Sequence, residues 1–134
     1  MRRAPMYGTL IVLVHLLLTL VHGAMHAKLG IDLDSAGLIF VLLVIGLCPL
    51  VAMVLLWTSG RTLGLALLAF SMAASLLFGA YHHFLVPGPD YVGQQSPGLA
   101  ATVFAASAYG ILGIEGLGAY ISLHYLLKRG DNSD

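Results

Sequence analysis

The chain has 134 residues, of which 59% are hydrophobic and only 9% carry a charge. A soluble domain carries roughly 25% charged residues, so this composition excludes a water-soluble globular protein and predicts a chain whose main solvent is lipid. The formal net charge is zero, which removes the electrostatic case for nucleic acid or an acidic partner.

Four apolar runs are long enough to cross a membrane as helices, which takes about 20 residues at about 1.5 Å per residue. They cover residues 7–27, 36–57, 62–86 and 98–127, and the polar segments between them are too short to form a separate domain. We therefore predict an all-α fold, an integral membrane four-helix bundle that forms a single domain over residues 1–134.

The placement of the basic residues predicts the orientation of this bundle. The ends that share a side with the N-terminus are flanked by Arg2, Arg3, Arg61, Lys128 and Arg129. The loops on the opposite side carry only Lys28, together with Asp32, Asp34 and Asp90. By the positive-inside rule both termini are cytoplasmic, in a cell inner or plasma membrane. The expected partner is the lipid bilayer, and association into a homo-oligomer or a larger membrane complex stays open.

The first span carries a polar stripe. At about 100° per residue, His15, Thr19, His22 and His26 lie within roughly 60° of one another. On the lipid side each imidazole would have unsatisfied nitrogens, so the stripe should face the interior of the bundle. The neighbouring Leu13, Leu17 and Leu20 should lie nearer to lipid.

The third and fourth spans bring further polar groups. Ser71, Ser75, Gly79 and His82 follow one face at steps of three and four residues, and His83 lies about 100° further round. Glu115 lies near the middle of the fourth span among small residues, which favour close helix packing. Counted by the helical rise, the histidines at 22, 26, 82 and 83 form an outer layer, with His15 and Glu115 roughly 20–25 Å from the outer interface.

The outer layer predicts a transition-metal site. His22 and His26 are one helical turn apart, so both imidazoles can reach one ion, and His82 and His83 lie at nearly the same depth. Imidazole ligands suit iron, copper or zinc, and Asp90 could fold back as an oxygen ligand. The pattern resembles in broad style the histidine boxes of membrane non-haem iron oxygenases, which have more histidines and longer chains. That resemblance implies a redox or oxygenase-like metalloenzyme, and we expect His82 to be the closer of its pair.

Two alternatives stay open at this point. A haem b needs one histidine from each of two facing helices, and His22 opposite His82 would serve an electron carrier. A carboxyl at the centre of the bilayer is functional by default, so Glu115 with His15 could act as a catalytic or proton-transferring pair, directed towards His124. The third hypothesis is accordingly a small proton- or cation-coupled transporter or an accessory membrane subunit. Whether the protein is an enzyme stays undecided.

Overall fold

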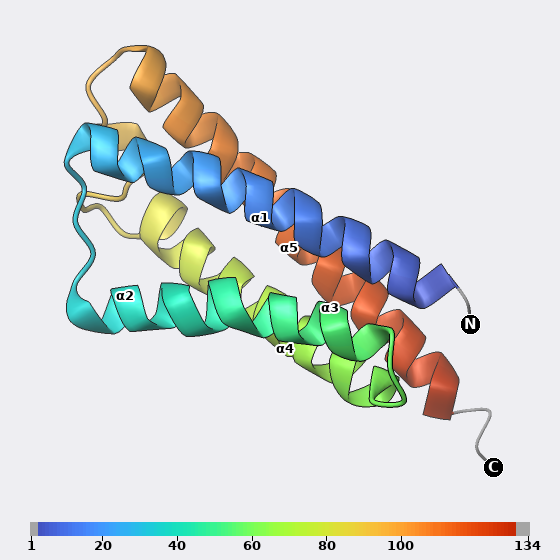
Figure 1. The fold of residues 1–134 in the computed structure, drawn as a ribbon. Coiled ribbons are helices and arrows are strands. Elements are labelled where there is room, and N and C mark those ends of the chain that lie inside the picture. The colour runs from blue at the N-terminus through green and yellow to red at the C-terminus, as the bar shows by residue number, and fades with distance from the viewer. Residues whose placement is uncertain (1–2, 131–134) are drawn as a thin grey trace.

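The computed structural model describes residues 3–130, and within them the chain forms helices and turns with no β-strand. Four helical rods run side by side (Figure 1). They are α1 (Arg3–Leu29), then α2 (Ser35–Phe40) with η1 (Val41–Leu47) and α3 (Cys48–Leu56), then α4 (Arg61–Ala80) with η2 (Tyr81–Leu85), and finally α5 (Leu99–Gly130) after the short turn η3 (Val92–Gln94). Each rod is long and apolar enough to cross a membrane, so the predicted all-α, four-span architecture is confirmed.

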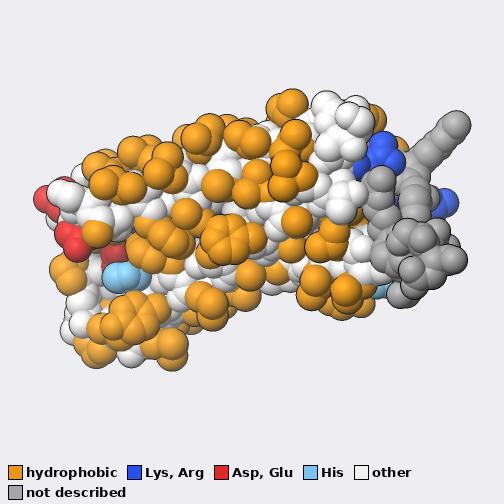
Figure 2. Space-filling view, turned by 90° about the horizontal axis from the view of Figure 1, so that it is seen from below, with side chains coloured by type: hydrophobic (Ala, Val, Ile, Leu, Met, Phe, Trp, Pro, Cys, Tyr) orange, Lys and Arg blue, Asp and Glu red, His pale blue; other side chains and the backbone are white. Residues whose placement is uncertain are grey.

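The bundle has two distinct ends. The start of α1, the end of α5 and the turn between α3 and α4 lie at one end, which we call the terminal end (Figure 1). The α1–α2 and α4–α5 connections lie at the other, which we call the histidine end. Between the ends the surface is apolar, with acidic groups at the histidine end and basic groups at the terminal end (Figure 2). Leu13, Leu17 and Leu20 are 52%, 63% and 64% exposed, so they belong to this lipid-facing surface, as expected.

The core of the bundle lies in its terminal half, where α1, α3 and α4 meet. Its members are Ile11, Val12, Ala52, Leu56, Leu65, Leu68 and Met72. Helices α3 and α4 approach so closely that a Cβ atom on Gly64 would lie 2.9 Å from the backbone nitrogen of Leu56. The Trp57 indole also donates to Thr9 Oγ1 at 2.9 Å, which fastens the end of α3 to α1. This half is therefore tightly closed.

The second rod changes its packing along its length. Segment α3 packs against both α1 and α4, whereas η1 packs against α4 and makes few contacts with α1. Towards the histidine end α2 diverges from α1 (Figure 1). The bundle is thus closed at the terminal end and open between α1 and α2 at the histidine end.

A widened turn precedes Pro49 in the second rod. Proline has no N–H to bond the preceding turn, and its ring clashes with the carbonyl four residues earlier. The chain accommodates this with the π-helical segment η1, in which the Cys48 N–H donates to Leu43 O, five residues back. The disturbance before Pro49 therefore takes the form of a π-turn, one of the usual causes of helix irregularity.

Candidate metal centre

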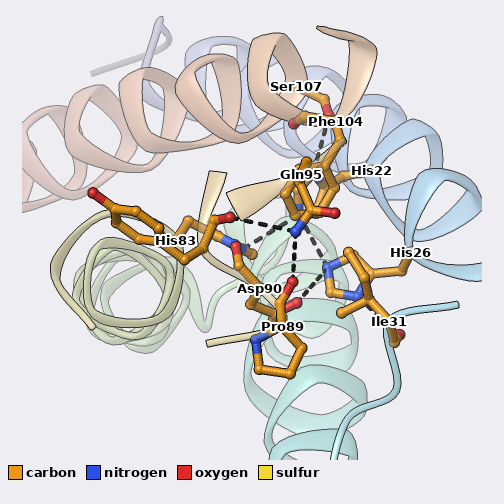
Figure 3. Close-up of polar contacts among 10 residues, drawn as sticks. His22, His26, Ile31, His83, Pro89, Asp90, Gln95, Phe104 and Ser107 are labelled. Atoms are coloured by element: carbon orange, nitrogen blue, oxygen red, sulfur yellow. Dashed lines mark hydrogen bonds and ion pairs between the residues drawn. The ribbon is translucent and has the colours of Figure 1, made fainter. Parts of the chain in front are cut away.

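Three imidazoles from two helices converge at the histidine end. His22 and His26 come from successive turns of α1, and His83 comes from η2 (Figure 3). Their Nε2 atoms are close: His22 to His26 is 3.2 Å, and His22 to His83 is 3.3 Å. Phe104 of α5 is fully buried and stacks on the His22 ring at 4.6 Å between centroids, which fixes the plane of that ring.

His83, and not His82, joins this cluster because the third rod ends in a π-turn. The Val86 N–H donates to Tyr81 O five residues back, so η2 holds one residue more per turn than an α-helix. Such a turn advances less around the helix axis per residue than an α-helix does, and His83 lies over Gly79, where a Cβ atom would be 3.9 Å from His83 Cδ2. His82 lies outside the cluster and packs on Phe78, with 4.4 Å between ring centroids. The expectation that His82 is the closer of the pair is therefore corrected.

The end of α1 orients His26. Gly30 has a φ of +67°, in the left-handed region that glycine adopts readily, and it terminates the helix. The Ile31 N–H then donates to His26 O at 3.0 Å, the six-to-one bond of a Schellman motif. The same turn directs Ile31 O towards His26, whose Nδ1 lies 3.4 Å away. A carbonyl can only accept, so His26 carries its proton on Nδ1.

Equivalent partners orient the other two rings. His83 Nδ1 lies 2.9 Å from the backbone oxygen of Asp90, so it too must donate. His22 Nδ1 lies 2.9 Å from Ser107 Oγ, and the Ser107 hydroxyl donates its single proton to Phe104 O. Ser107 is therefore an acceptor towards His22. In their neutral forms, all three imidazoles carry the proton on Nδ1.

The consequence is that three Nε2 lone pairs point at one another. Two of these nitrogens cannot bond each other without a cation between them, and one proton can bridge only one pair. A metal ion can accept all three. Nitrogens at about 2.0–2.1 Å from a tetrahedral ion lie about 3.3 Å apart, close to the spacings between His22 and its two neighbours. The three histidines could thus hold a metal ion in this arrangement.

A carboxylate lies beside the three histidines. Asp90 Oδ1 is 3.4 Å from His26 Nε2, and this oxygen is buried with no hydrogen-bond partner among residues 3–130. The loop that carries it is held by Gln95, whose side chain donates to Pro89 O at 2.6 Å (Figure 3). The Asp90 carboxylate therefore places a negative charge beside the three neutral imidazoles.

His15 and Glu115 form a second polar pair deeper in the bundle. His15 Nε2 is 3.1 Å from Glu115 Oε1, and the two side chains are only 2% and 1% exposed. Glu115 Oε2 has no hydrogen-bond partner within the described part of the chain. The sequence predicted that both residues face the interior, and the structure places them there in direct contact.

A cavity of about 450 Å³ connects the two polar layers. His22, His26 and His83 line it at one end, and Glu115 lines it at the other. Its walls come from α1, the α1–α2 connection, α2 with η1, α4 with η2, and α5. The histidine cluster is therefore not sealed within protein but borders a space large enough for a small molecule.

Sequence reasoning did not identify Ser107 and Phe104 as parts of the site. A signal for Ser107 exists, because it lies two turns before Glu115 on the same face of the fourth span. Phe104 and the carbonyl acceptors carry no such signal. His124, near the terminal end, is exposed and stacks loosely on Tyr120 with 6.1 Å between centroids.

No known protein family, curated protein or solved structure matches this chain.

Proposed function

We propose that this chain is an integral membrane metalloprotein that binds a transition metal through His22, His26 and His83. The observation that carries the proposal is the convergence of three Nε2 atoms whose Nδ1 partners are all hydrogen-bond acceptors. Metal-bound histidines almost always donate their other ring N–H to such a partner, since this fixes the tautomer and the ring orientation.

The donor set bears on the identity of the metal. Imidazole suits zinc, copper and iron, and the separations of 3.2 and 3.3 Å from His22 Nε2 to its two neighbours, each about one tetrahedral edge, fit zinc. Three protein ligands with an open fourth position are typical of catalytic rather than structural zinc sites. The open position would face the cavity, with Asp90 beside it. An activated water or a polarised substrate at that position is the chemistry that such a metal supplies.

The two alternatives have less support. A haem between His22 and His82 requires those rings to face each other, and His82 packs instead on Phe78. Transport through His15 and Glu115 requires a path onward to the terminal end. Between that pair and the terminal end lie the apolar core residues Val12, Leu56 and Leu68, which are at most 1% exposed and offer no side chain that could carry a proton or cation.

Metal titration of the purified protein in lipid nanodiscs tests the proposal. Each of His22→Ala, His26→Ala and His83→Ala should weaken zinc affinity, because each removes one metal ligand. Removing a group that only hydrogen-bonds a ligand costs about 10–100-fold in affinity, and the loss of a ligand should cost more. His124→Ala is the control and should bind like the parent protein. X-ray absorption should report nitrogen neighbours at about 2.0–2.1 Å. Equal affinity in all four variants would exclude the site, and a Soret band in the purified protein would favour haem.

A further inference from the structure

Besides Asp90 Oδ1 at the histidine cluster, three buried oxygen atoms have no hydrogen-bond partner among residues 3–130. They are Thr19 Oγ1, Ser75 Oγ and Glu115 Oε2, and all three residues line the cavity. A buried polar atom without a hydrogen-bond partner is destabilising, so three such atoms on one cavity indicate that a further group bonds them.

These oxygens belong to one end of the cavity. Thr19 lies one turn after His15, which bonds the other oxygen of Glu115. Ser75 lies one turn before Gly79, and a Cβ atom on Gly79 would lie 4.0 Å from Glu115 Oε2. Thr19 and Ser75 therefore approach Glu115 from α1 and α4.

The three oxygens have a definite hydrogen-bonding complement. While the shared proton lies between His15 and Glu115 Oε1, Glu115 Oε2 is an acceptor that needs a donor. The Thr19 and Ser75 hydroxyls can each donate. One hydroxyl group on a ligand matches this set, since it donates once and accepts twice.

The remainder of the cavity is apolar and lies next to the lipid. Leu38, Val41 and Ile45 of the second rod line one wall, and Ile111 and Leu112 of α5 line another. At about 450 Å³, the cavity lies within the size range of small-molecule sites. The cavity is partly open, and one of its walls comes from α2 and η1, which make few contacts with α1.

We infer that the cavity binds a lipophilic molecule with one hydroxyl group, which enters from the bilayer between α1 and α2. Its hydroxyl bonds Glu115 Oε2 and the hydroxyls of Thr19 and Ser75, and its apolar body lies along Val41 and Ile45 towards the histidines. This site does not require the metal, so it can be tested with the metal removed.

Photolabelling in lipid nanodiscs tests the inference, with a decanol that carries a diazirine at its far end. Labels should map to Val41, Ile45 or Ile111 in the chelator-treated protein. The matched methyl ether lacks the donor and should label about tenfold less, since one hydrogen bond to a buried acceptor is worth about the free energy of a tenfold change in affinity. Thr19→Val combined with Ser75→Ala should lower the labelling yields of the alcohol and the ether alike, because it removes the two hydroxyls that donate to the ligand oxygen of either probe.

Two tryptophan variants separate the cavity from the lipid-facing surface. Ile45→Trp fills the cavity and should abolish labelling. Leu42→Trp, one turn away and 60% exposed to lipid, should leave it unchanged. Equal labelling by alcohol and ether in the parent protein, or equal labelling of Ile45→Trp and Leu42→Trp, would overturn the inference. So would an unlabelled cavity, which would assign the three oxygens to water. Loss of metal binding alone would change none of these results.

Discussion

At the scale of single residues, the geometry of the candidate centre depends on the hydrogen bonds that the three histidines make through Nδ1, the ring nitrogen that points away from the cluster. Ile31 O, Asp90 O and Ser107 Oγ hold the three Nδ1 atoms. Two of these acceptors are backbone carbonyls, which no side-chain substitution removes. Ser107 is the exception, and it offers direct access to the orientation of His22.

Ser107→Ala should weaken metal affinity about 10–100-fold while leaving the three ligands in place, because His22 loses the acceptor that fixes its tautomer. Ser71→Ala is a matched control, since Ser71 is equally buried and likewise bonds the carbonyl three residues back, but lies outside the cavity lining. Competition with a chelator of known affinity measures both variants. An affinity loss of the same size in Ser71→Ala would assign the effect to packing and not to His22.

At the scale of helices, the sequence predicts the depth of each side chain along its helix well, and the direction in which it points around the helix axis less well. Periodicity placed His15, His22 and His26 on one inward face, and the structure confirms it, because the side chains of His15 and His22 are 2% and 7% exposed. Helical rise also placed the histidine pair of the third span level with those of the first. These inferences hold because α1 is a regular α-helix over its whole length.

The periodicity of the third span does not predict its rotation at His82 and His83, because it assumes an uninterrupted α-helix. Tyr81–Leu85 itself contains no proline or glycine, but Pro87 lies two residues beyond its end. Pro49 lies two residues beyond the end of η1 in the same way. A proline at this spacing follows both π-turns, and it is the sequence signal that the periodicity leaves out.

The π-turn therefore makes a sharp prediction about two adjacent residues. His83→Ala should lose the metal, whereas His82→Ala should retain it with affinity within about twofold of the parent protein, as expected for a residue that is not a ligand. Metal content after dialysis at equal protein concentration measures both. If His82→Ala loses the metal and His83→Ala keeps it, the third rod is a continuous α-helix in the membrane and His82 is the ligand from that rod.

At the scale of the whole molecule, the two ends differ in both packing and charge. The terminal half is closed by the core around Leu56 and Leu68, and the histidine half is open between α1 and α2. An asymmetric bundle of this kind can hold a ligand at one end while the other end supplies stability. The histidine cluster, the cavity and the buried His15–Glu115 pair all lie on the open side of that core.

The same asymmetry carries the prediction of orientation. Basic side chains gather at the terminal end and acidic ones at the histidine end (Figure 2). Arg61 begins α4 after the turn at the terminal end, whereas Asp32, Asp34 and Asp90 belong to the two connections at the histidine end. Lys and Arg in short loops are retained on the cytoplasmic side, so both termini should be cytoplasmic and the histidine end extracytoplasmic.

Reporter fusions test this orientation without reference to the metal. A phosphatase inserted at Gly93, in the α4–α5 loop, should be active only if that loop is extracytoplasmic, and the same reporter after Asp134 should be inactive. A fluorescent protein at the two positions should produce the inverse pattern. Because Gly93 and the histidine cluster lie at the same end of the bundle, the readout also decides which compartment the proposed metal site faces. If the phosphatase at Gly93 is active, a chelator that cannot cross the membrane should remove the metal from intact cells. An active phosphatase after Asp134 would reverse the bundle, so that the proposed site faces the cytoplasm.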